Sequence, residues 1–263
     1  MTDSREFDRK YFESRYGRTG LGRSAEQRRA FIYKALIAIL RRACSAPAVV
    51  VEVGCGVGYL TKHLARIGGS PFVISTDISA DGLHLARSNL LAFANVALCR
   101  ADAEAVPCRT DVADVVVAFD VIEHLPHPDK FFAEARRVLR PNGILMLSTP
   151  NPHSLGHRIK GHFPEWRGRP YKERALQWFG FRDDTHISIR SIEGWRQTIR
   201  SAGFTIVRDG TDFWWDTPYV GWIPGIIQKV VFNGTHRIVT ILFGFLNWRY
   251  GENYLALCRR VAE

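Results

Sequence analysis

The chain has 263 residues, a length that suits one large α/β domain or one domain with a substantial insertion. Hydrophobic residues make up 46% and charged residues 24%, which excludes a largely disordered chain, and no apolar run approaches the ~20 residues of a membrane span. The net charge is +10 and the five cysteines form no CxxC pair, so we expect a basic cytoplasmic protein with reduced thiols and no cysteine zinc site.

Short β-branched runs alternate with helical patterns through the first half of the chain. These runs predict buried strands at 48–54, 71–77, 95–102, 114–120 and 143–150. The clearest helix begins at Pro128 and stops at the turn sequence PNG, residues 141–143. Strands that alternate with helices predict a doubly wound, mostly parallel α/β sheet with right-handed crossovers.

The second half of the chain begins with a long polar and aromatic stretch, 151–190. A helix capped by Ser191 and ended by Gly203 follows it, and two final strands are predicted at 204–210 and 254–260. About 40 residues separate these two strands, far more than an ordinary loop holds. They predict a helical, aromatic-rich insertion (213–250) with two short apolar helices, within 213–232 and 236–251, and with four tryptophans, Trp214, Trp215, Trp222 and Trp248.

A glycine-rich turn, EVGCGVGYL (52–60), follows the first predicted strand and opens a helix. Glycines let the backbone turn tightly and approach a ligand, which then meets the helix N-terminus. The spacing GxGxG differs from the GxGxxG of nicotinamide sites, and Glu52 stands two positions before the first glycine. Asp77 ends the second predicted strand, where a carboxylate can accept both ribose hydroxyls. Helix capping or surface ion pairs are the alternative roles of Glu52 and Asp77.

Together with ADAEAVP (101–107), these residues resemble the class I S-adenosylmethionine-dependent methyltransferases over residues 45–150. The resemblance implies a Rossmann-like sheet of seven strands, the last antiparallel, and S-adenosylmethionine as cofactor. It implies that the glycines contact the methionine and ribose, that Asp77 holds the ribose hydroxyls and that Phe119 and Asp120 lie beside the sulfonium. Ile78 would pack on the adenine, whose edge Asp102 and Ala103 would contact. The implied cofactor-binding set is Glu52, Gly54, Cys55, Gly56, Gly58, Asp77, Ile78, Asp102, Ala103, Phe119, Asp120, Tyr11 and Tyr16.

The charge distribution agrees with a cationic cofactor. Residues 44–150 carry 9 Lys and Arg against 11 Asp and Glu, whereas residues 1–43 carry 11 against 5 and residues 151–263 carry 16 against 10. We therefore divide one domain into an N-terminal helical lid (1–43), a cofactor-binding core (44–150) and a substrate-side segment (151–263). Tyr11, Phe12 and Tyr16 are candidate lid contacts, although the same segment suits an amphipathic helix that packs on the domain. The basic flanks suit an anionic partner or a generic solvated surface.

Beyond the fourth predicted strand, the sequence DVIEH (120–124) is similar to the subgroup of ubiquinone-biosynthesis O-methyltransferases, also called methyltransferase type 11. It is more weakly similar to enzymes that methylate the 3′-terminal 2′-hydroxyl of small RNAs. Both similarities select Glu123, His124 and His186 as catalytic candidates. In a helical turn Asp120, Glu123 and His124 would share one face, and together with His186 they could ligate Mg²⁺ or a similar ion. Alternatively, His124 is a general base or orienting residue and Glu123 a hydrogen-bond acceptor.

The insertion suits several partners. Aromatic residues beside basic ones are typical of a membrane interface, so a peripheral membrane contact is one interpretation. A pocket for a lipophilic acceptor, a homodimer contact and a plain hydrophobic core are others. We expect a methyltransferase that acts on a small, lipophilic or natural-product acceptor. The alternatives are a metal-dependent RNA 2′-O-methyltransferase, with nucleic acid as a less favoured partner, and a non-catalytic methyltransferase-like binding module.

Overall fold

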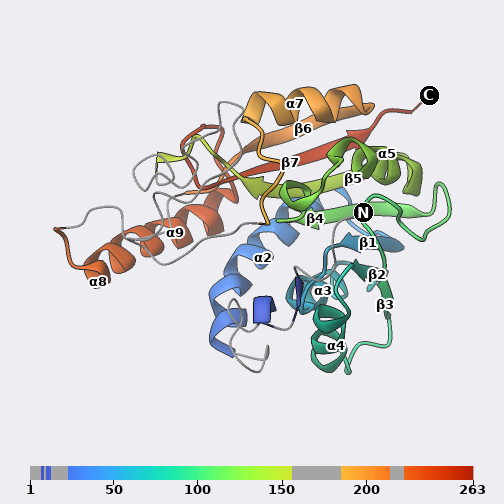
Figure 1. Ribbon diagram of the computed structural model, residues 1–263, viewed down its shortest axis with the longest axis horizontal. Helices are drawn as coiled ribbons and strands as arrows, with labels where there is room; N and C mark the ends of the chain where they lie inside the picture. Colours follow the sequence, from blue (N-terminus) through green and yellow to red (C-terminus); the bar gives the residue numbers. More distant parts are fainter. Residues whose placement is uncertain (1–6, 9, 13–22, 156–184, 214–221, 263) are drawn as a thin grey trace.

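A computed structural model describes residues 7–8, 10–12, 23–155, 185–213 and 222–262, with backbone alone for residues 23–29. Its centre is one seven-stranded sheet (Figure 1) made of β1 (Val49–Val53), β2 (Phe72–Asp77), β3 (Val96–Arg100), β4 (Ala113–Phe119), β5 (Leu139–Pro150), β6 (Phe204–Thr211) and β7 (Asn253–Arg260). The strand order is β3-β2-β1-β4-β5-β7-β6. β1 to β5 pair in parallel, while β7 runs antiparallel to both β5 and β6. The predicted Rossmann-like fold with an antiparallel last strand is confirmed.

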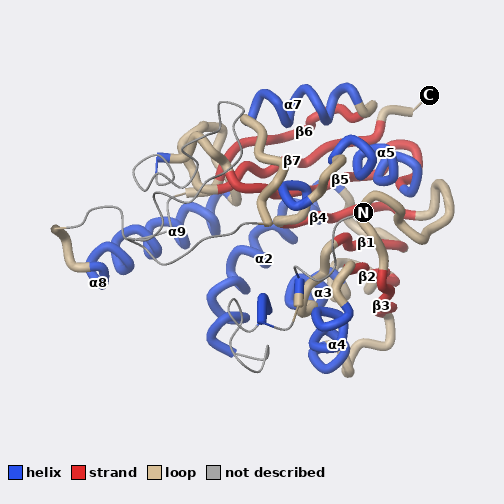
Figure 2. Tube along the Cα trace, viewed as in Figure 1, coloured by secondary structure: helices blue, strands red, loops and turns tan. Residues whose placement is uncertain are grey.

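Helices cover both faces of the sheet (Figures 1 and 2). They are α2 (Arg23–Ala43), α3 (Tyr59–Leu64), α4 (Ala80–Asn89), α5 (Pro128–Val138), α7 (Ile192–Ser201), α8 (Gly225–Gln228) and α9 (Gly234–Phe243). A single turn of 3₁₀-helix, η2 (Ile122–His124), follows β4, and a π-helical turn, η3 (Lys229–Asn233), joins α8 to α9. The caps predicted for α7 are present, because the Ser191 Oγ accepts from the Gly194 N–H at 3.1 Å and Gly203 has φ of 80°.

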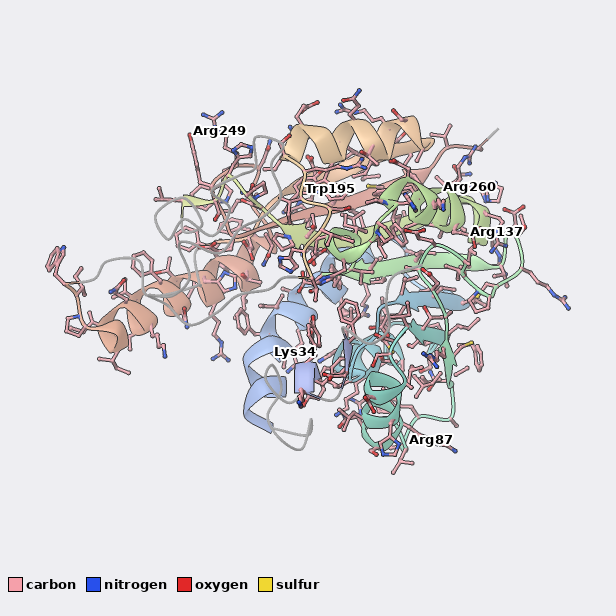
Figure 3. The ribbon with its side chains drawn as sticks, in the orientation of Figure 1. Lys34, Arg87, Arg137, Trp195, Arg249 and Arg260 are labelled. Carbon is pink, nitrogen blue, oxygen red and sulfur yellow. The ribbon has the colours of Figure 1, made fainter. Side chains whose placement is uncertain are left out.

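The two faces of the sheet bury separate apolar clusters, as the period of two along each strand requires. On β4, Val116 and Ala118 join the cluster beneath α5 and α7, whereas Val115 and Val117 join the cluster beneath α2 and α3. The first cluster is built around large rings, among them that of Trp195, which belongs to α7 (Figure 3). Because both faces are buried, the central strands read as continuous apolar runs rather than as alternating ones.

The insertion between β6 and β7 differs from its prediction. Two helices were expected, within 213–232 and 236–251, but α8, η3 and α9 form one helical run from Gly225 to Phe243. Asn233 and Gly234 keep right-handed helical angles, so the chain does not break between them. The run ends at Gly244, whose φ of 73° reverses the chain toward β7. Of the four tryptophans, Trp214 and Trp215 lie outside the described residues.

The helical run lies against α2 and extends away from the sheet at one end of the molecule (Figure 1). Trp248 anchors the return to β7, since its Nε1 donates to the Asp212 carbonyl at 2.9 Å and its ring stacks on Phe213 at 5.3 Å. Within the described residues, no helix has the length and hydropathy that crossing a membrane requires.

Candidate active site

The glycine-rich turn after β1 adopts a conformation that glycine alone takes without strain. Gly54, Gly56 and Gly58 have φ of 73°, 52° and 78°, in the left-handed region that side chains disfavour. The N–H groups of Gly54 and Cys55 donate to the Thr76 carbonyl at 2.8 and 2.9 Å, which fixes the turn to the end of β2. A Cβ at Gly54 would lie 2.3 Å from a Val121 methyl group. The absence of side chains therefore leaves a cradle at the carboxyl end of the parallel strands, where α/β sheets bind ligands.

Asp77 lies next to this cradle at the end of β2. Its two carboxylate oxygens accept from the Gly56 N–H at 2.7 Å and from the Ser79 N–H at 2.9 Å. Burial raises the pKa of this carboxyl, and the hydrogen bonds from backbone N–H groups oppose the increase. The carboxylate is thus held at a fixed position beside the turn, as a contact to ribose hydroxyls would require.

Glu52, on β1, is buried beneath the turn. Thr61 and Ser75 both donate to its Oε2, at 2.6 and 2.8 Å. The Ser75 hydroxyl lies within hydrogen-bonding distance of this carboxylate because Glu52 and Ser75 are register partners in the β1–β2 pair. Burial raises the pKa of this carboxyl to about 7. Glu52 is therefore a buried, oriented acid and not the surface ion pair that was its alternative role.

One cavity of about 930 Å³ contains most of the residues proposed for the cofactor. It extends from the glycine-rich turn along the ends of β2, β3 and β4 to the insertion. The predicted residues that line it are Tyr11, Glu52, Gly54, Cys55, Gly56, Asp77, Ile78, Asp102, Ala103, Phe119, Asp120 and His124. Gly58 lies behind the turn, where its Cα faces Leu90 and Ala86. The described part of the chain does not include Tyr16.

The described N-terminal residues, 7–8 and 10–12, lie against the same turn. Phe7 and Phe12 are buried with Val57 and Tyr59, and the Ser79 Oγ donates to the Phe7 carbonyl at 2.5 Å. Tyr11 contacts Phe7 edge-on, at 5.1 Å between ring centroids, and lines the cavity. These contacts bring the N-terminal segment over the site, and its function as a lid remains a prediction.

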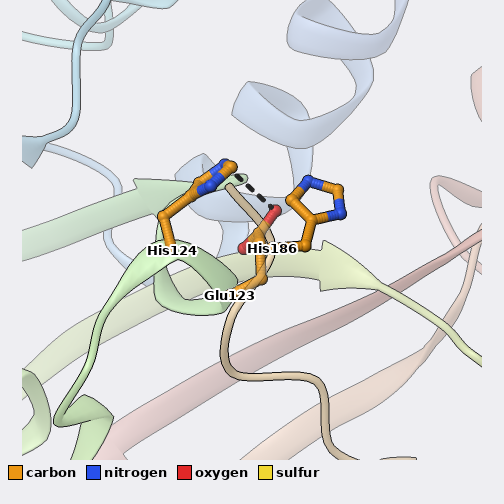
Figure 4. Close-up of side chains that lie close together, drawn as sticks. All are labelled: Glu123, His124 and His186. Carbon is orange, nitrogen blue, oxygen red and sulfur yellow. Dashed lines mark ion pairs between the residues drawn. The ribbon is translucent and has the colours of Figure 1, made fainter. Parts of the chain in front are cut away.

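Glu123, His124 and His186 form a cluster beside the end of β4 (Figure 4). The backbone carbonyl of Glu123 accepts from the N–H groups of Ile187 and Ser188, which brings the two distant segments together. The His124 Nδ1 lies 3.0 Å from the Thr185 carbonyl oxygen. The Thr185 Oγ1 lies 2.9 Å from the same nitrogen. Because the carbonyl can only accept and the hydroxyl can accept as well, we assign the proton to Nδ1, which makes Nε2 the unprotonated nitrogen. The Nε2 lies 4.0 Å from the Glu123 carboxylate, and the rings of His124 and His186 are 4.8 Å apart.

Asp120 does not join this cluster as expected. Its φ of 54° turns it away from the helical geometry that would align it with Glu123 and His124, and its Oδ1 accepts from the Ser148 Oγ at 2.8 Å. The remaining donor atoms, two imidazoles and one carboxylate, lie within 4.8 Å of one another. Mg²⁺ prefers an octahedron of oxygen ligands at about 2.0–2.1 Å. The donor set therefore does not fit the Mg²⁺ site that the sequence suggested.

A second part of the cavity, which we call the second chamber, is lined by residues that no motif identified. Phe31, Ile32 and Leu36 of α2 line it, and so do Asn233, His236 and Thr240 of the helical run. The Phe31 and His236 rings meet edge-on at 5.5 Å, and burial lowers the pKa of His236 to about 4, which keeps it neutral. The aromatic-rich insertion was the one signal in the sequence for this second chamber.

Comparison with known proteins agrees with this geometry. The family model described as a methyltransferase domain matches residues 24–209. A malonyl-[acyl-carrier protein] O-methyltransferase of Halalkalibacterium halodurans is 30% identical over 118 residues, 44% of each chain. A ubiquinone biosynthesis O-methyltransferase of a Chelativorans species is 31% identical over 103 residues, 39% of this chain and 40% of that one.

The chain spans less than half the length of these two curated relatives. Among solved structures, the PH0226 protein of Pyrococcus horikoshii OT3 has a TM-score of 0.62 and 18% identity, and the match covers 95% of this chain and 98% of that one. At this identity the likeness concerns the fold alone.

Proposed function

Since the chain belongs to the class I S-adenosylmethionine-dependent methyltransferases, we propose that it methylates a hydroxyl group of a small, lipophilic acceptor. The observation that carries this proposal is the cavity, which joins the glycine-rich turn and Asp77 to His124 and then to a second chamber. Ligand sites span about 300–1,000 Å³. A cavity of about 930 Å³ is at the upper end of that range and suits two ligands side by side.

The residues of the first chamber fit the cofactor. The glycine-rich turn offers a cradle without side chains, and Asp77 offers oriented carboxylate oxygens for hydroxyl groups. Asp102 and Ala103 line the wall at the end of β3, and Phe119 does so at the end of β4. When bound, S-adenosylmethionine supplies a methyl group on a positively charged sulfur. The buried carboxyls of Glu52 and Asp77 suit a cation.

His124 has the geometry of a general base. With its Nδ1 proton placed toward the carbonyl and hydroxyl oxygens of Thr185, Nε2 is the ring nitrogen that accepts the proton of an acceptor hydroxyl. As the methyl group is transferred, the acceptor oxygen gains a bond to carbon and loses its proton to Nε2. The Glu123 carboxylate, 4.0 Å from Nε2, stabilises the imidazolium that results. His186 packs on the His124 ring and orients it.

The second chamber supports the acceptor class. Phe31, Ile32 and Leu36 give it an apolar wall, and Asn233, His236 and Thr240 add a few polar groups, the combination that is typical of small-molecule sites. Two relatives are named O-methyltransferases, one of ubiquinone biosynthesis and one of malonyl-[acyl-carrier protein], and these names agree with transfer to an oxygen atom.

The test supplies methyl-labelled S-adenosylmethionine and a cell extract, and label is counted in the organic-soluble and RNA fractions. We expect label in the organic phase from the wild-type chain and a loss of about 100-fold for His124→Ala, the usual range for a general base. The control His127→Ala removes an exposed histidine three residues away and should retain full transfer. Label in RNA would contradict the acceptor class. No label in any fraction, despite cofactor binding, would favour a non-catalytic module.

A further inference from the structure

The helical run Gly225–Phe243 carries a continuous apolar face that no part of the described chain covers. Its outward side chains are between 52% and 71% exposed to solvent. They are Ile226, Ile227, Val230, Val231, Ile238, Ile241, Leu242 and Phe243. Trp222, just before the run, is 84% exposed. Contiguous apolar surface of this kind marks an interaction site rather than ordinary scatter.

The inward stripe of the same run is polar. Gln228, His236 and Thr240 each retain 2% exposure, and their spacing of eight and four residues places them on one side of a helix. Gln228 donates to the Ile223 carbonyl at 2.7 Å, whereas His236 and Thr240 line the cavity. An ordinary surface helix places its apolar stripe inward and its polar residues in water. This run does the reverse.

An exposed apolar face suits an apolar partner, and the charges around this face distinguish between the possible partners. Residues 217–251 contain no Asp or Glu and carry Lys229, Arg237 and Arg249. Lys229 and Arg237 belong to the helical run itself and are exposed. An aliphatic face flanked by basic residues and an exposed tryptophan is the pattern of a helix in an anionic lipid interface.

A second copy of this chain fits the face less well. A two-fold contact would bring the same face of both copies together. Lys229 and Arg237 of one copy would then lie near the same residues of the other, with no acidic residue of 217–251 to offset them. Anionic lipid headgroups supply the missing charge.

We infer that the outward face of α8, η3 and α9 docks on an anionic lipid bilayer and that a lipophilic acceptor enters the cavity from it. The inference of docking depends only on the exposed apolar face and the charges beside it, whereas the entry route rests on the proposed function. The cavity wall includes Lys229, Val230 and Arg237, which are exposed, so the cavity reaches the surface beside the apolar face. An apolar molecule would pass from the bilayer to the chamber of His236 and Thr240 without crossing water.

The experiment measures co-sedimentation of the full chain with vesicles of phosphatidylcholine, alone or mixed in equal parts with phosphatidylglycerol. We expect binding to the mixed vesicles to exceed binding to pure phosphatidylcholine by about tenfold or more, because each basic residue near an anionic surface adds affinity. The variant I238Q/I241Q/L242Q removes three outward side chains that do not line the cavity. It should bind the mixed vesicles about 100-fold more weakly.

The matched control, L91Q/V207Q/V261Q, removes three exposed aliphatic side chains elsewhere, which retain 82%, 51% and 45% exposure. It should bind vesicles as the wild-type chain does. Equal losses in both variants, or no binding by the wild-type chain, would overturn the inference. A dimer in light scattering that only the α9 variant abolishes, without vesicle binding, would assign the face to a second copy instead.

Both variants are first checked for S-adenosylmethionine binding by calorimetry, and I226Q/I227Q on α8 replaces the α9 variant if that variant fails to fold. Vesicle binding requires no methyl transfer. Absent transfer with intact vesicle binding would therefore contradict the proposed function alone. Transfer to an acceptor in detergent without any vesicle binding would contradict this inference alone.

Discussion

Glu52→Gln should make the protein more stable at alkaline pH and flatten the dependence of its stability on pH. The Glu52 carboxyl is buried, and burial raises its pKa from the ordinary 4.5 to about 7. An unfolded chain releases this proton near pH 4.5, whereas the folded chain keeps it until about pH 7. The folded state therefore binds more protons in that window, and stability falls as pH rises through it.

The size of the effect follows from the two pKa values. At 1.36 kcal/mol for each pH unit, the difference corresponds to roughly 3 kcal/mol of unfolding free energy, present below pH 4.5 and lost above pH 7. Glutamine carries no charge, and its amide oxygen can accept from Thr61 and Ser75, which both donate to one oxygen of Glu52. The variant should thus avoid the cost of a buried charge without losing these hydrogen bonds.

Urea unfolding without cofactor at pH 5 and pH 8.5 measures the effect. The difference in unfolding free energy between the two pH values should be roughly 2 to 3 kcal/mol smaller in Glu52→Gln than in the wild-type chain, because a small part of the effect is already lost at pH 5. Asp77, whose pKa burial also raises, keeps part of the slope in both proteins. The control Glu193→Gln changes a carboxylate that is 70% exposed and should leave the slope unchanged. Parallel pH profiles for Glu52→Gln and the wild-type chain would refute the reasoning.

Three further substitutions test the site. Asp77→Ala should weaken S-adenosylmethionine binding by about 10- to 100-fold in calorimetry, the range of hydrogen bonds to a charged group, and unchanged affinity would exclude Asp77 as a contact. His124→Ala should lower kcat by about 100-fold while the Kd for the cofactor stays within about twofold, and a matching loss of cofactor affinity would argue against a base. Gly54→Ala should abolish cofactor binding, because its Cβ would lie 2.3 Å from Val121. Adding Val121→Ala should restore part of it, and the remaining deficit measures the left-handed φ of 73°.

The sequence predicted the sheet well because its signals were local. Each parallel strand is buried on both faces and reads as an unbroken apolar run, and Ser191 and Gly203 marked the ends of α7. The start of β5 was wrong by four residues, since the strand begins at Leu139 and not at Gly143. The pairing shifts between Ala113 and Val115. Such an irregularity depends on the partner strand. The turn sequence PNG, residues 141–143, indicated a loop at the place where the strand already runs.

The grouping of the glycine-rich turn with the ends of three strands around one cavity was predictable for the same reason, because each of these signals is local. The second chamber was indicated only by the aromatic-rich insertion, and the contacts that form it were not predictable. Phe31 and His236 meet at 5.5 Å although about 200 residues separate them, and no short motif encodes that contact. The segment that carries His186 is fixed by backbone hydrogen bonds from Ile187 and Ser188 to Glu123. The sequence named His186 through its resemblance to a family and not through its spacing.

The helical run of the insertion shows what periodicity can and cannot predict. The pattern of its apolar residues identifies a stripe that avoids water, but the usual assignment of that stripe to the core assumes a packed core on the inner side. Here the inner side is the wall of a cavity, so Gln228, His236 and Thr240 turn inward and the aliphatic residues turn outward. The outward stripe then requires a partner beyond the described chain. Residues 217–251 contain no Asp or Glu and carry Lys229 and Arg237, which favours a partner that is both anionic and apolar. Vesicle binding by the wild-type chain and by the α9 variant decides whether that partner is the bilayer.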